Sequence, residues 1–335
     1  MTISAHADMT HDVSLPDLAR PVAAQMELVS RHLEQLLPEG MGGVAPVVYL
    51  HLLQAGGKRL RPLLTLLSCQ AAGGVPEDAV GLAGAVEVIH LASLVHDDVI
   101  DEAQERRGRP SARNRWGNRA SILVGDLLIA EVFRRLADEL GREALGALAN
   151  AVVAMCQAEL GDSEPGAWPT EEAYLDHIHG KTAALMGAAC EVGARAAGNG
   201  EALEALRDYG LRLGLAFQIC DDLLDLYGDP ARLGKPIWQD LAVGNWTLPV
   251  IAALEAAGAG ERAELLALLE SVKGGRLDRA GEAARAVAEL GGRSYAELRA
   301  ETLAAEAAIS LAPLPESAAR GSLVSLTQYV VRRGL

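Results

Sequence analysis

The sequence predicts an all-α protein folded as one large helical bundle. Half of its 335 residues are apolar, which is enough to bury a large core. After residue 16, Ala, Leu, Glu and Arg dominate, apolar residues recur at helical spacing, and strand signals are nearly absent. No change of composition and no Pro/Ser-rich linker interrupts this pattern, so we expect a single domain over residues 17–335 rather than two.

Proline and glycine residues divide this domain into about a dozen predicted helices. Pro62 and Pro76 stand where a first helical turn would begin, and the pair Gly56-Gly57 stands where a helix would stop. The preceding residues 1–16 are polar and are predicted to be a disordered lead. The longest predicted helices cover residues 76–103, 119–140, 170–197 and 201–227.

Composition and charge argue against several classes of protein. The net charge of −15 argues against nucleic acid as a partner, because binding a polyphosphate backbone requires clustered cations. No stretch reaches the ~18 uninterrupted apolar residues of a membrane span, and the N-terminus lacks the pattern of a signal peptide. We therefore expect a cytoplasmic protein without a transmembrane segment. Its cysteines, at no metal-ligand spacing, are predicted to be buried thiols: Cys69, Cys156, Cys190 and Cys220.

The strongest chemical signal is an aspartate-rich pentapeptide that occurs twice, each time within an apolar run. The copies supply two sets of carboxylates: Asp97, Asp98 and Asp101 from DDVID, and Asp221, Asp222 and Asp225 from DDLLD. On a helix the first and last aspartates of each copy share one face. Like charges at that spacing, among Val, Ile and Leu, are unfavourable unless a cation neutralises them. Oxygen-only ligands of this kind suit Mg²⁺, which usually shares its shell with substrate phosphates.

A solvated acidic helix face is the alternative explanation for these pentapeptides. By chance, one such pentapeptide is expected in roughly one chain of this size in ten, and two in on the order of one in a hundred. Because apolar residues flank both copies, we favour the metal-binding interpretation.

Basic residues stand where a bound diphosphate would need them. A lone surface cation is usually only solvated. In an acidic chain, however, acid clusters that are each followed by isolated cations indicate a site for metal ions plus a polyanion. The cations concerned are Lys58, Arg61, Arg106, Arg107, Arg109, Lys181 and Lys235.

Several motifs together carry a resemblance to a known family. They are GGKRLRP at 56–62, HDDVIDEAQERRGRP at 96–110, HGKTAAL at 179–185, FQICDDLLDLYGDPARLGKP at 217–236 and, near the C-terminus, YVVRR. With these motifs the chain resembles the trans-prenyltransferases, the polyprenyl diphosphate synthase family, over about residues 44–250. The resemblance implies the isoprenoid synthase type of helical bundle, with a central apolar pocket, and a homodimer.

The resemblance also implies roles for individual residues. The diphosphate of the acceptor, isopentenyl diphosphate, would be held by Gly57, Lys58, Arg61, His90 and Arg107, and Arg333 could approach it. The diphosphate of the allylic substrate would contact the catalytic cations Arg106, Lys181 and Lys235, while Thr182, Phe217 and Gln218 would lie near the substrates. Three Mg²⁺ ions would bind Asp97, Asp101 and Asp221, with Asp98, Asp222 and Asp225 in the same metal-binding set.

Three positions depart from the family pattern. Asn245 stands where a lysine is usual, so one phosphate-facing cation is replaced by a neutral amide. Trp238 stands where a glycine is usual, which would crowd the loop that closes over the metals. Where Glu-Gly-Glu and a later Gln are usual, this chain has Gln157-Ala158-Glu159 and Asp162. Rate, affinity or substrate choice could therefore differ from the family pattern.

The predicted reaction is Mg-dependent, head-to-tail condensation of an allylic diphosphate with isopentenyl diphosphate to give an all-trans polyprenyl diphosphate. Ionisation of the allylic C–O bond requires stabilisation of the departing diphosphate, and no side-chain base is required. Two alternatives stay open: a class I terpene cyclase-like enzyme, which ionises a prenyl diphosphate without an acceptor, and a non-catalytic subunit of a heteromeric prenyl diphosphate synthase. The complete second aspartate motif and GGKRLRP favour an enzyme with an acceptor.

Product length is predicted from the residues just before the first aspartate motif. Ala92 and Ser93 precede Asp97 by about 6 to 7 Å along a helix axis, where a chain growing away from the metals would pass. Both are small, and aromatic residues make up only 4% of the chain, so few candidates exist to close the pocket. The sequence therefore predicts products longer than C15. The alternative is ordinary close packing of helices at these small residues.

Overall fold

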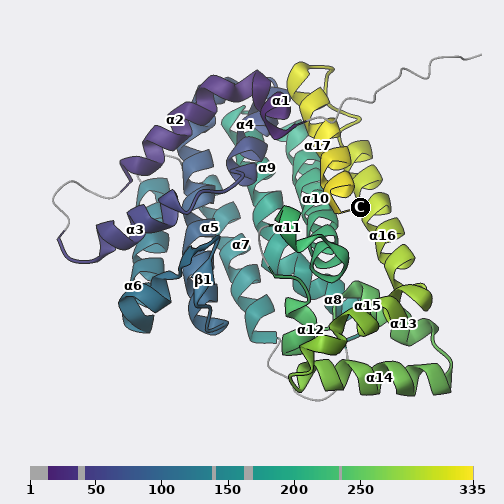
Figure 1. Ribbon diagram of the computed structural model, residues 1–335. Helices are drawn as coiled ribbons and strands as arrows, with labels where there is room; N and C mark the ends of the chain where they lie inside the picture. Colours follow the sequence, from purple (N-terminus) through teal and green to yellow (C-terminus); the bar gives the residue numbers. More distant parts are fainter. Residues whose placement is uncertain (1–13, 37–41, 138–140, 162–168, 234–235, 335) are drawn as a thin grey trace, which may run out of the picture.

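The computed structural model confirms the all-α prediction (Figure 1). It describes residues 14–36, 42–137, 141–161, 169–233 and 236–334. These contain seventeen α-helices and one antiparallel pair of two-residue strands, β1 (Glu105–Arg106) and β2 (Arg109–Pro110). The helices are α1 (Leu15–Ala19), α2 (Ala23–Glu34), α3 (Ala45–Gln54), α4 (Leu60–Ala71), α5 (Val80–Ile100), α6 (Ala112–Arg135), α7 (Arg142–Gly161), α8 (Glu171–Ile178), α9 (Ala184–Ala196), α10 (Gly200–Tyr227), α11 (Pro230–Leu233), α12 (Gln239–Val243), α13 (Leu248–Ala256), α14 (Ala259–Lys273), α15 (Ala280–Glu289), α16 (Gly292–Ser310) and α17 (Ala318–Gly334).

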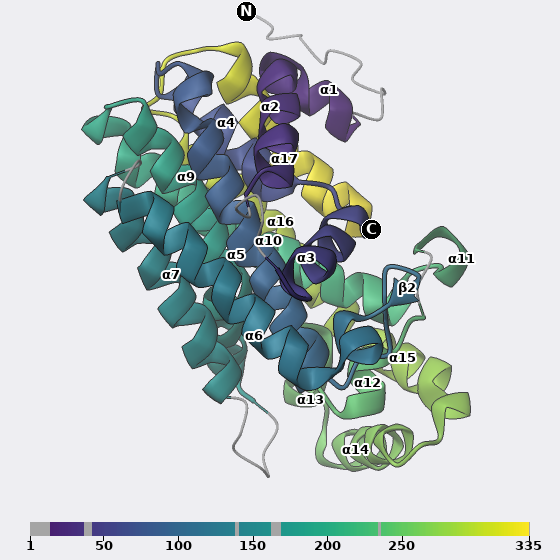
Figure 2. The same cartoon turned by 90° about the vertical axis from the view of Figure 1, so that its left-hand side faces the viewer.

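Helix α9 lies at the centre of the bundle and packs against α4, α5, α7 and α10. Helix α10 is covered on its other side by α16 and α17, and α6 packs on the outside of α5 (Figures 1 and 2). Glycine permits the closest approaches, because a Cβ at Gly193 of α9 would come within 2.3 Å of the backbone oxygen of Thr65 on α4. These contacts fix the relative positions of the two helices, α5 and α10, that carry the aspartate motifs.

The apolar side chains form two cores. The larger extends from Leu18 of α1 to Val330 of α17 and includes both helices that carry the aspartate motifs. The smaller lies at one end of the bundle and joins α12, α13, α14 and α15 to Leu226, at the end of α10. Tyr227 and Trp246 pack against both cores, so the smaller core is continuous with the end of the second aspartate motif.

The long predicted helices are observed, with differences at their ends. The helix predicted over 76–103 begins as a 3₁₀ turn, Pro76–Ala79, and continues as α5. The helix predicted from residue 119 begins earlier, at Ala112, and is broken at Gly117, whose φ of 80° lies outside the helical region. The predicted disordered lead, 1–16, falls largely outside the described residues, although Leu15 already belongs to α1.

Two of the described helical segments have the length and hydropathy of a membrane span, Pro76–Ile100 and Arg142–Gly161. In the first, 67% of the apolar window is buried, as in the core helix of a bundle. In the second, which is α7, only 17% is buried, so α7 presents an apolar face that the described residues leave largely uncovered. The same face explains why the prediction for Cys156 was wrong: this thiol is exposed on α7, whereas Cys69, Cys190 and Cys220 are buried.

Candidate active site

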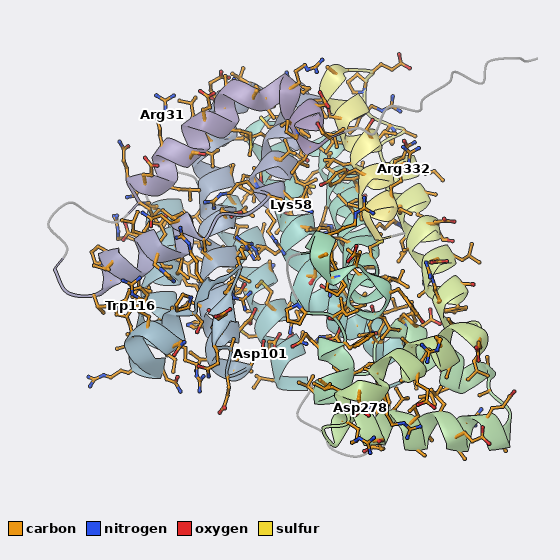
Figure 3. The ribbon with its side chains drawn as sticks, viewed as in Figure 1. Arg31, Lys58, Asp101, Trp116, Asp278 and Arg332 are labelled. Carbon is orange, nitrogen blue, oxygen red and sulfur yellow. The ribbon has the colours of Figure 1, made fainter. Side chains whose placement is uncertain are left out.

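The first aspartate motif forms the end of α5. Asp97 and Asp98 lie in its last turn, and Asp101 is the C-cap residue, labelled at the lower end of the helix in Figure 3. Carboxylates at a helix C-terminus face the negative end of the helix dipole and repel one another. Asp98 is only 1% exposed, whereas Asp101 is exposed. A bound cation would offset this unfavourable arrangement.

Asp97 lies close to two cations, Lys181 and Arg106, and to two other acids. Burial raises the pKa of Asp97 to about 6; Lys181 opposes this shift, and Glu159 and Asp101 reinforce it. Lys181 Nζ lies 2.7 Å from Glu159 Oε1. Lys181 projects from a π-helical turn, His179–Ala183, and such turns are frequent at functional sites. The fold therefore places a lysine beside both an acid of α7 and the first aspartate motif.

Asp98 is held by the hairpin that follows α5. Arg106 Nε donates a hydrogen bond of 2.6 Å to Asp98 Oδ1. The other carboxylate oxygen, Oδ2, is buried and has no hydrogen-bond partner within the part of the chain that the structure describes. A buried carboxylate oxygen without a donor is unfavourable unless a ligand reaches it.

The hairpin holds Arg107 in a strained conformation. Arg107 and Gly108 are the two turn residues between β1 and β2, with φ angles of 53° and 72°. Two-residue hairpin turns of this type require positive φ at both positions, which is unfavourable for arginine. The hairpin is held by His51 Nε2, 2.9 Å from Pro110 O, and by Ser111, whose hydroxyl donates to Ala103 O. These contacts fix Arg107 despite its backbone strain.

Arginines of this hairpin and of the turn before α4 converge around His90. Burial lowers the pKa of His90 well below its usual range, and Arg61, Arg107, Arg106 and Arg59 lower it further. His90 is therefore neutral at physiological pH, and one of its ring nitrogens remains a hydrogen-bond donor. A concentration of guanidinium groups around a neutral imidazole is suited to an anion with several oxygens.

The turn before α4 is shaped to admit these arginines. A Cβ at Gly57, where φ is 152°, would come within 2.6 Å of Arg107 Nη1, so glycine is required there. Arg61 is half-buried, and its Nε has no hydrogen-bond partner among the described residues. Lys58 Nζ lies over the ring of Tyr329 of α17, 5.9 Å from its centroid, between the helices in Figure 3. Gly57, Arg59 and Arg61 of GGKRLRP thus lie beside Arg107 of the hairpin, while Lys58 lies against α17.

The second aspartate motif is tied into a buried chain of hydrogen bonds. Tyr174 Oη donates to Asp222 Oδ2 at 2.6 Å, and Gln218 Nε2 donates to Asp222 Oδ1 at 2.9 Å. Thr182 Oγ1 in turn donates to Gln218 Oε1 at 2.7 Å. Burial raises the pKa of Asp222 well above its usual range, and the nearby Asp240 and Asp221 add to the shift. Both oxygens of Asp222 are therefore occupied by protein donors.

Asp225, the last aspartate of the motif, caps the short helix α12. Its Oδ1 accepts from Gln239 N–H at 3.2 Å and its Oδ2 from Asp240 N–H at 3.1 Å, while its carbonyl accepts from Trp238 N–H at 2.8 Å. Backbone N–H groups at a helix start favour an anion, so Asp225 stabilises the loop that follows α10.

The two unusual loop residues also make defined contacts. Trp238 adopts a left-handed conformation with φ 65°, which explains why glycine suits this position. Its indole N–H donates to Leu226 O at 3.1 Å, and its ring lies against Gly281 of α15. Asn245 is exposed and donates from Nδ2 to Asp240 Oδ1 at 2.9 Å. The two departures from the family pattern therefore change residues around the second aspartate motif: Trp238 contacts Leu226, and Asn245 contacts Asp240.

The carboxylates fit a hard cation that is shared with a substrate. Within the described ranges, no group of three or more His, Cys, Asp or Glu residues is arranged to hold a metal by itself. The unpartnered Oδ2 of Asp98, the raised pKa of Asp97 and the all-oxygen donor set nevertheless favour a divalent cation such as Mg²⁺, which accepts few protein ligands and completes its shell with phosphate and water. Asp221 is half-buried and attracts Arg61, so the second motif faces the arginine cluster.

Some predicted site residues cannot be placed. Lys235 and Asp162 lie outside the described residues, and the side chain of Arg333 is likewise not described. Phe217 is half-buried on α10, one residue before Gln218. Ala92 is fully buried, while Ser93 is half-buried and its hydroxyl donates to His90 O at 2.9 Å.

Sequence reasoning missed several residues that support the site, namely Arg59, Glu87, Glu159 as the partner of Lys181, Tyr174 and Asp240. For Glu87 a signal exists: it is an acid within the apolar stretch that ends at the first motif, three residues before His90. Tyr174 gives no such signal, because its partner lies 48 residues away in the sequence.

Comparison with known proteins identifies the class to which this fold belongs: it is that of a prenyltransferase. A family model described as polyprenyl synthetase matches residues 46–287, and the chain belongs to this family. It is 38% identical to a short chain isoprenyl diphosphate synthase from Methanothermobacter thermautotrophicus, over 90% of this chain and 95% of that protein.

Solved structures give the same result. A decaprenyl diphosphate synthase from Rhodobacter capsulatus matches with a TM-score of 0.88 and 39% identity, covering 96% of this chain and 99% of that one. A polyprenyl synthase from Caulobacter crescentus, complexed with calcium and isoprenyl diphosphate, matches with a TM-score of 0.87 and 36% identity, covering 95% and 97%. The predicted family, fold class and enzyme class are therefore confirmed.

Proposed function

We propose that this prenyltransferase is magnesium-dependent and condenses an allylic diphosphate head-to-tail with isopentenyl diphosphate to give an all-trans polyprenyl diphosphate longer than C15. The observation that supports this most strongly is the presence of two neighbouring anion sites with different chemistry. One combines the carboxylates of Asp97 and Asp101 with Lys181, and the other gathers arginines around His90. Two such sites suit two diphosphates, one of them bound with metal.

The allylic diphosphate would bind beside Lys181, Arg106 and Lys235. Asp97, Asp101 and Asp221 would hold three Mg²⁺ ions, with the other aspartates of the two motifs supporting this set. When bound, Mg²⁺ neutralises part of the charge that develops on the diphosphate as the allylic C–O bond breaks. Lys181 and Arg106 stabilise the same charge from fixed positions, because each is already held by an acid, Glu159 or Asp98.

The acceptor diphosphate would bind at Lys58, Arg61, Arg107 and His90, next to the turn at Gly57. Its double bond attacks the allylic carbon; a C–C bond forms, the diphosphate leaves, and one proton is then lost to that diphosphate. Thr182 and Gln218, joined by a hydrogen bond, would border the substrates with Phe217. Neutral His90 donates to the acceptor diphosphate and takes no part in proton transfer.

The test uses the purified full chain with labelled isopentenyl diphosphate, Mg²⁺ and a panel of allylic diphosphates. We expect label in chain-extended products and no turnover when a chelator is present. Consumption of the allylic diphosphate without incorporation of label would indicate a terpene cyclase-like enzyme. If neither substrate is consumed, the chain acts as a non-catalytic subunit.

Product length is tested at Ala92, on the helix that carries Asp97. Ala92→Phe would fill the path of the growing chain without touching the carboxylates, so products should shorten. Ser93→Ala, a small-for-small control on the next residue, should leave the product profile unchanged. Chromatography of extracted products decides the matter: a wild-type product of C15, or an unaltered profile in Ala92→Phe, would contradict this assignment.

The uncovered apolar face of α7 supports a homodimer. Large apolar side chains are exposed on α6 and α7, including Leu123 (56%) and Val153 (54%). Both helices lie on the side of the bundle that faces the viewer in Figure 2. Burial of such a face by a second copy removes apolar area from water. Leu123→Asp should produce monomers in light scattering, while Ile309→Asp, at an exposed apolar residue of α16, should not. A cytoplasmic location is proposed with the same function.

A further inference from the structure

Next to the arginine cluster lies a buried acid that takes no part in the proposed reaction. Glu87 of α5 is 4% exposed, and its Oε1 accepts a hydrogen bond of 2.6 Å from Arg59 Nη1. The pair is partly buried on both sides, with side-chain exposures of 6% for Glu87 and 21% for Arg59. Burying an ion pair costs free energy that the attraction between its two charges often fails to offset. Stability alone therefore does not explain why this pair is buried.

The backbone of Arg59 is strained at the same place. Its φ and ψ of 49° and 38° are left-handed, which is unfavourable for a residue with a Cβ. No side-chain hydrogen bond caps α4 at this residue. Strain of this kind persists where the surroundings hold it, and it is concentrated at ligand-binding sites. The ion pair with Glu87 is the side-chain contact that holds Arg59 in this turn.

Glu87 also attracts the two arginines that were assigned to the acceptor. It acts on the charged forms of Arg61 and Arg107, which repel each other. Arg61 has a buried Nε without a partner among the described side chains, and Arg107 Nη1 lies 2.6 Å from where a Cβ of Gly57 would be. Without Glu87, the guanidinium groups of half-buried Arg59 and Arg61 and of exposed Arg107 would repel one another before any anion arrives.

We propose that Glu87 is a positioning residue of the acceptor site, which holds the strained turn through Arg59 and keeps Arg61 and Arg107 close together for a diphosphate. The inference rests on the proposed function, because that function assigns the arginine cluster to isopentenyl diphosphate. Glu87 touches no substrate; it acts through Arg59 and the charge that it shares with the other two arginines.

The proposal predicts different effects on the KM values of the two substrates. The cations of the allylic site are held by other acids, since Lys181 pairs with Glu159 and Arg106 with Asp98. Loss of Glu87 should therefore raise KM for isopentenyl diphosphate and leave KM for the allylic diphosphate nearly unchanged. A merely structural role would alter both constants together with thermal stability.

The test compares Glu87→Gln, Arg59→Met and the double variant Arg59→Met/Glu87→Met in steady-state kinetics. Each single change should raise KM for isopentenyl diphosphate about tenfold, with less than about a twofold change for the allylic substrate. The double variant should resemble the single ones, because both changes break the same contact. It also leaves no unpaired buried charge, so it remains informative if a single variant fails to fold. Glu191→Gln on α9, a partly buried acid that is also paired with an arginine, is the control and should change neither KM.

A second measurement does not depend on turnover. Inorganic pyrophosphate, titrated calorimetrically in the presence of a chelator, should bind the arginine cluster of the wild-type chain and bind Glu87→Gln about tenfold more weakly. Unchanged binding and kinetics, equal changes in both KM values, or effects that multiply in the double variant would each overturn the proposal. If the wild-type chain consumes no isopentenyl diphosphate, the proposed function fails, and the pyrophosphate titration alone still decides whether Glu87 organises an anion site.

Discussion

The two aspartate motifs have the same pattern, yet the structure surrounds them differently. At the end of α5, Asp98 accepts one hydrogen bond from Arg106 and keeps a buried oxygen without a donor, and Asp101 is exposed. On α10, Asp222 is held by Tyr174 and Gln218, and Asp225 accepts from two backbone N–H groups. The carboxylates of the first motif therefore have few hydrogen-bond donors around them, whereas the last two aspartates of the second motif accept hydrogen bonds at both oxygens.

This difference shows that the pentapeptide sequence alone does not define the role of each aspartate. A carboxylate that lacks donors in the protein is stabilised by a cation, and one that is saturated with donors supports its surroundings. We expect Asp97, whose pKa is raised by burial, and Asp221, which faces the arginine cluster, to matter for turnover. Asp222 and Asp225 should matter for the shape of the second half of the site.

The largest expected effect is on turnover. Asp97→Ala and Asp221→Ala should each reduce kcat by about a hundredfold or more, since metal ions supply several kcal/mol of charge stabilisation. The fold should remain intact or become slightly more stable, because removing a carboxylate relieves repulsion in the metal-free protein. Activity and thermal melting are measured side by side. An Asp97→Ala variant that keeps more than a few per cent of wild-type turnover at saturating Mg²⁺ would show that the metal assignment is wrong.

The second prediction concerns the free energy of unfolding rather than turnover. Asp225→Ala removes the acceptor of two N–H groups at the start of α12 and should lower the free energy of unfolding by about 2 kcal/mol. Asp221→Ala, four residues earlier on the same helix, is the control and should not destabilise the protein. Denaturant unfolding in the presence of a chelator measures both. Equal stability of the two variants would remove the distinction between the aspartates of this motif.

The sequence was sufficient for the all-α fold and its long helices, and it pointed to the carboxylates of the candidate site. Helical periodicity predicted α5 and α10 closely, and two acidic pentapeptides in apolar runs indicated carboxylates with a special purpose. It could not separate Asp221 from Asp222, because the distinction depends on Tyr174, which only the packing of α8 against α10 brings near. Nor could it show that Arg59 and Arg107 both lie near His90, since their strained turns meet only in three dimensions.

The third prediction concerns pH. The pKa of Asp97 is raised to about 6 from 3.8, so the protonated form is favoured in the folded, metal-free protein. This contribution is fully present below about pH 4 and is lost as the pH rises through 6. Asp97→Asn, which resembles the protonated acid, should therefore match the wild-type chain at pH 4 and be about 3 kcal/mol more stable at pH 7.5.

Urea unfolding of the metal-free proteins at several pH values measures this difference. A variant that is less stable than the wild-type chain at pH 7.5 would mean that Asp97, like Asp225, is supplied with donors by the protein. Saturating Mg²⁺ and pyrophosphate should reverse the order of stability at that pH, because only the wild-type carboxylate can hold the cation.

The smallest expected effect is at Asn245, beneath the second motif. Its amide donates to Asp240 Oδ1, and the Asp240 N–H is in turn held by Asp225, so Asn245 closes the contacts that begin at the second motif. Asn245→Lys would introduce a cation at an exposed position, where a charge-assisted contact with a diphosphate contributes about 1 kcal/mol. KM for the allylic substrate at low Mg²⁺ should then fall about fivefold.

Asn245→Met, which lengthens the side chain without adding charge, is the control and should give no such gain. The indole of Trp238 could keep the lysine from the phosphate, and for that reason the double variant with Trp238→Gly is measured as well. An unchanged KM in both variants would show that the loop after the second motif supports Asp240 and does not reach the substrate.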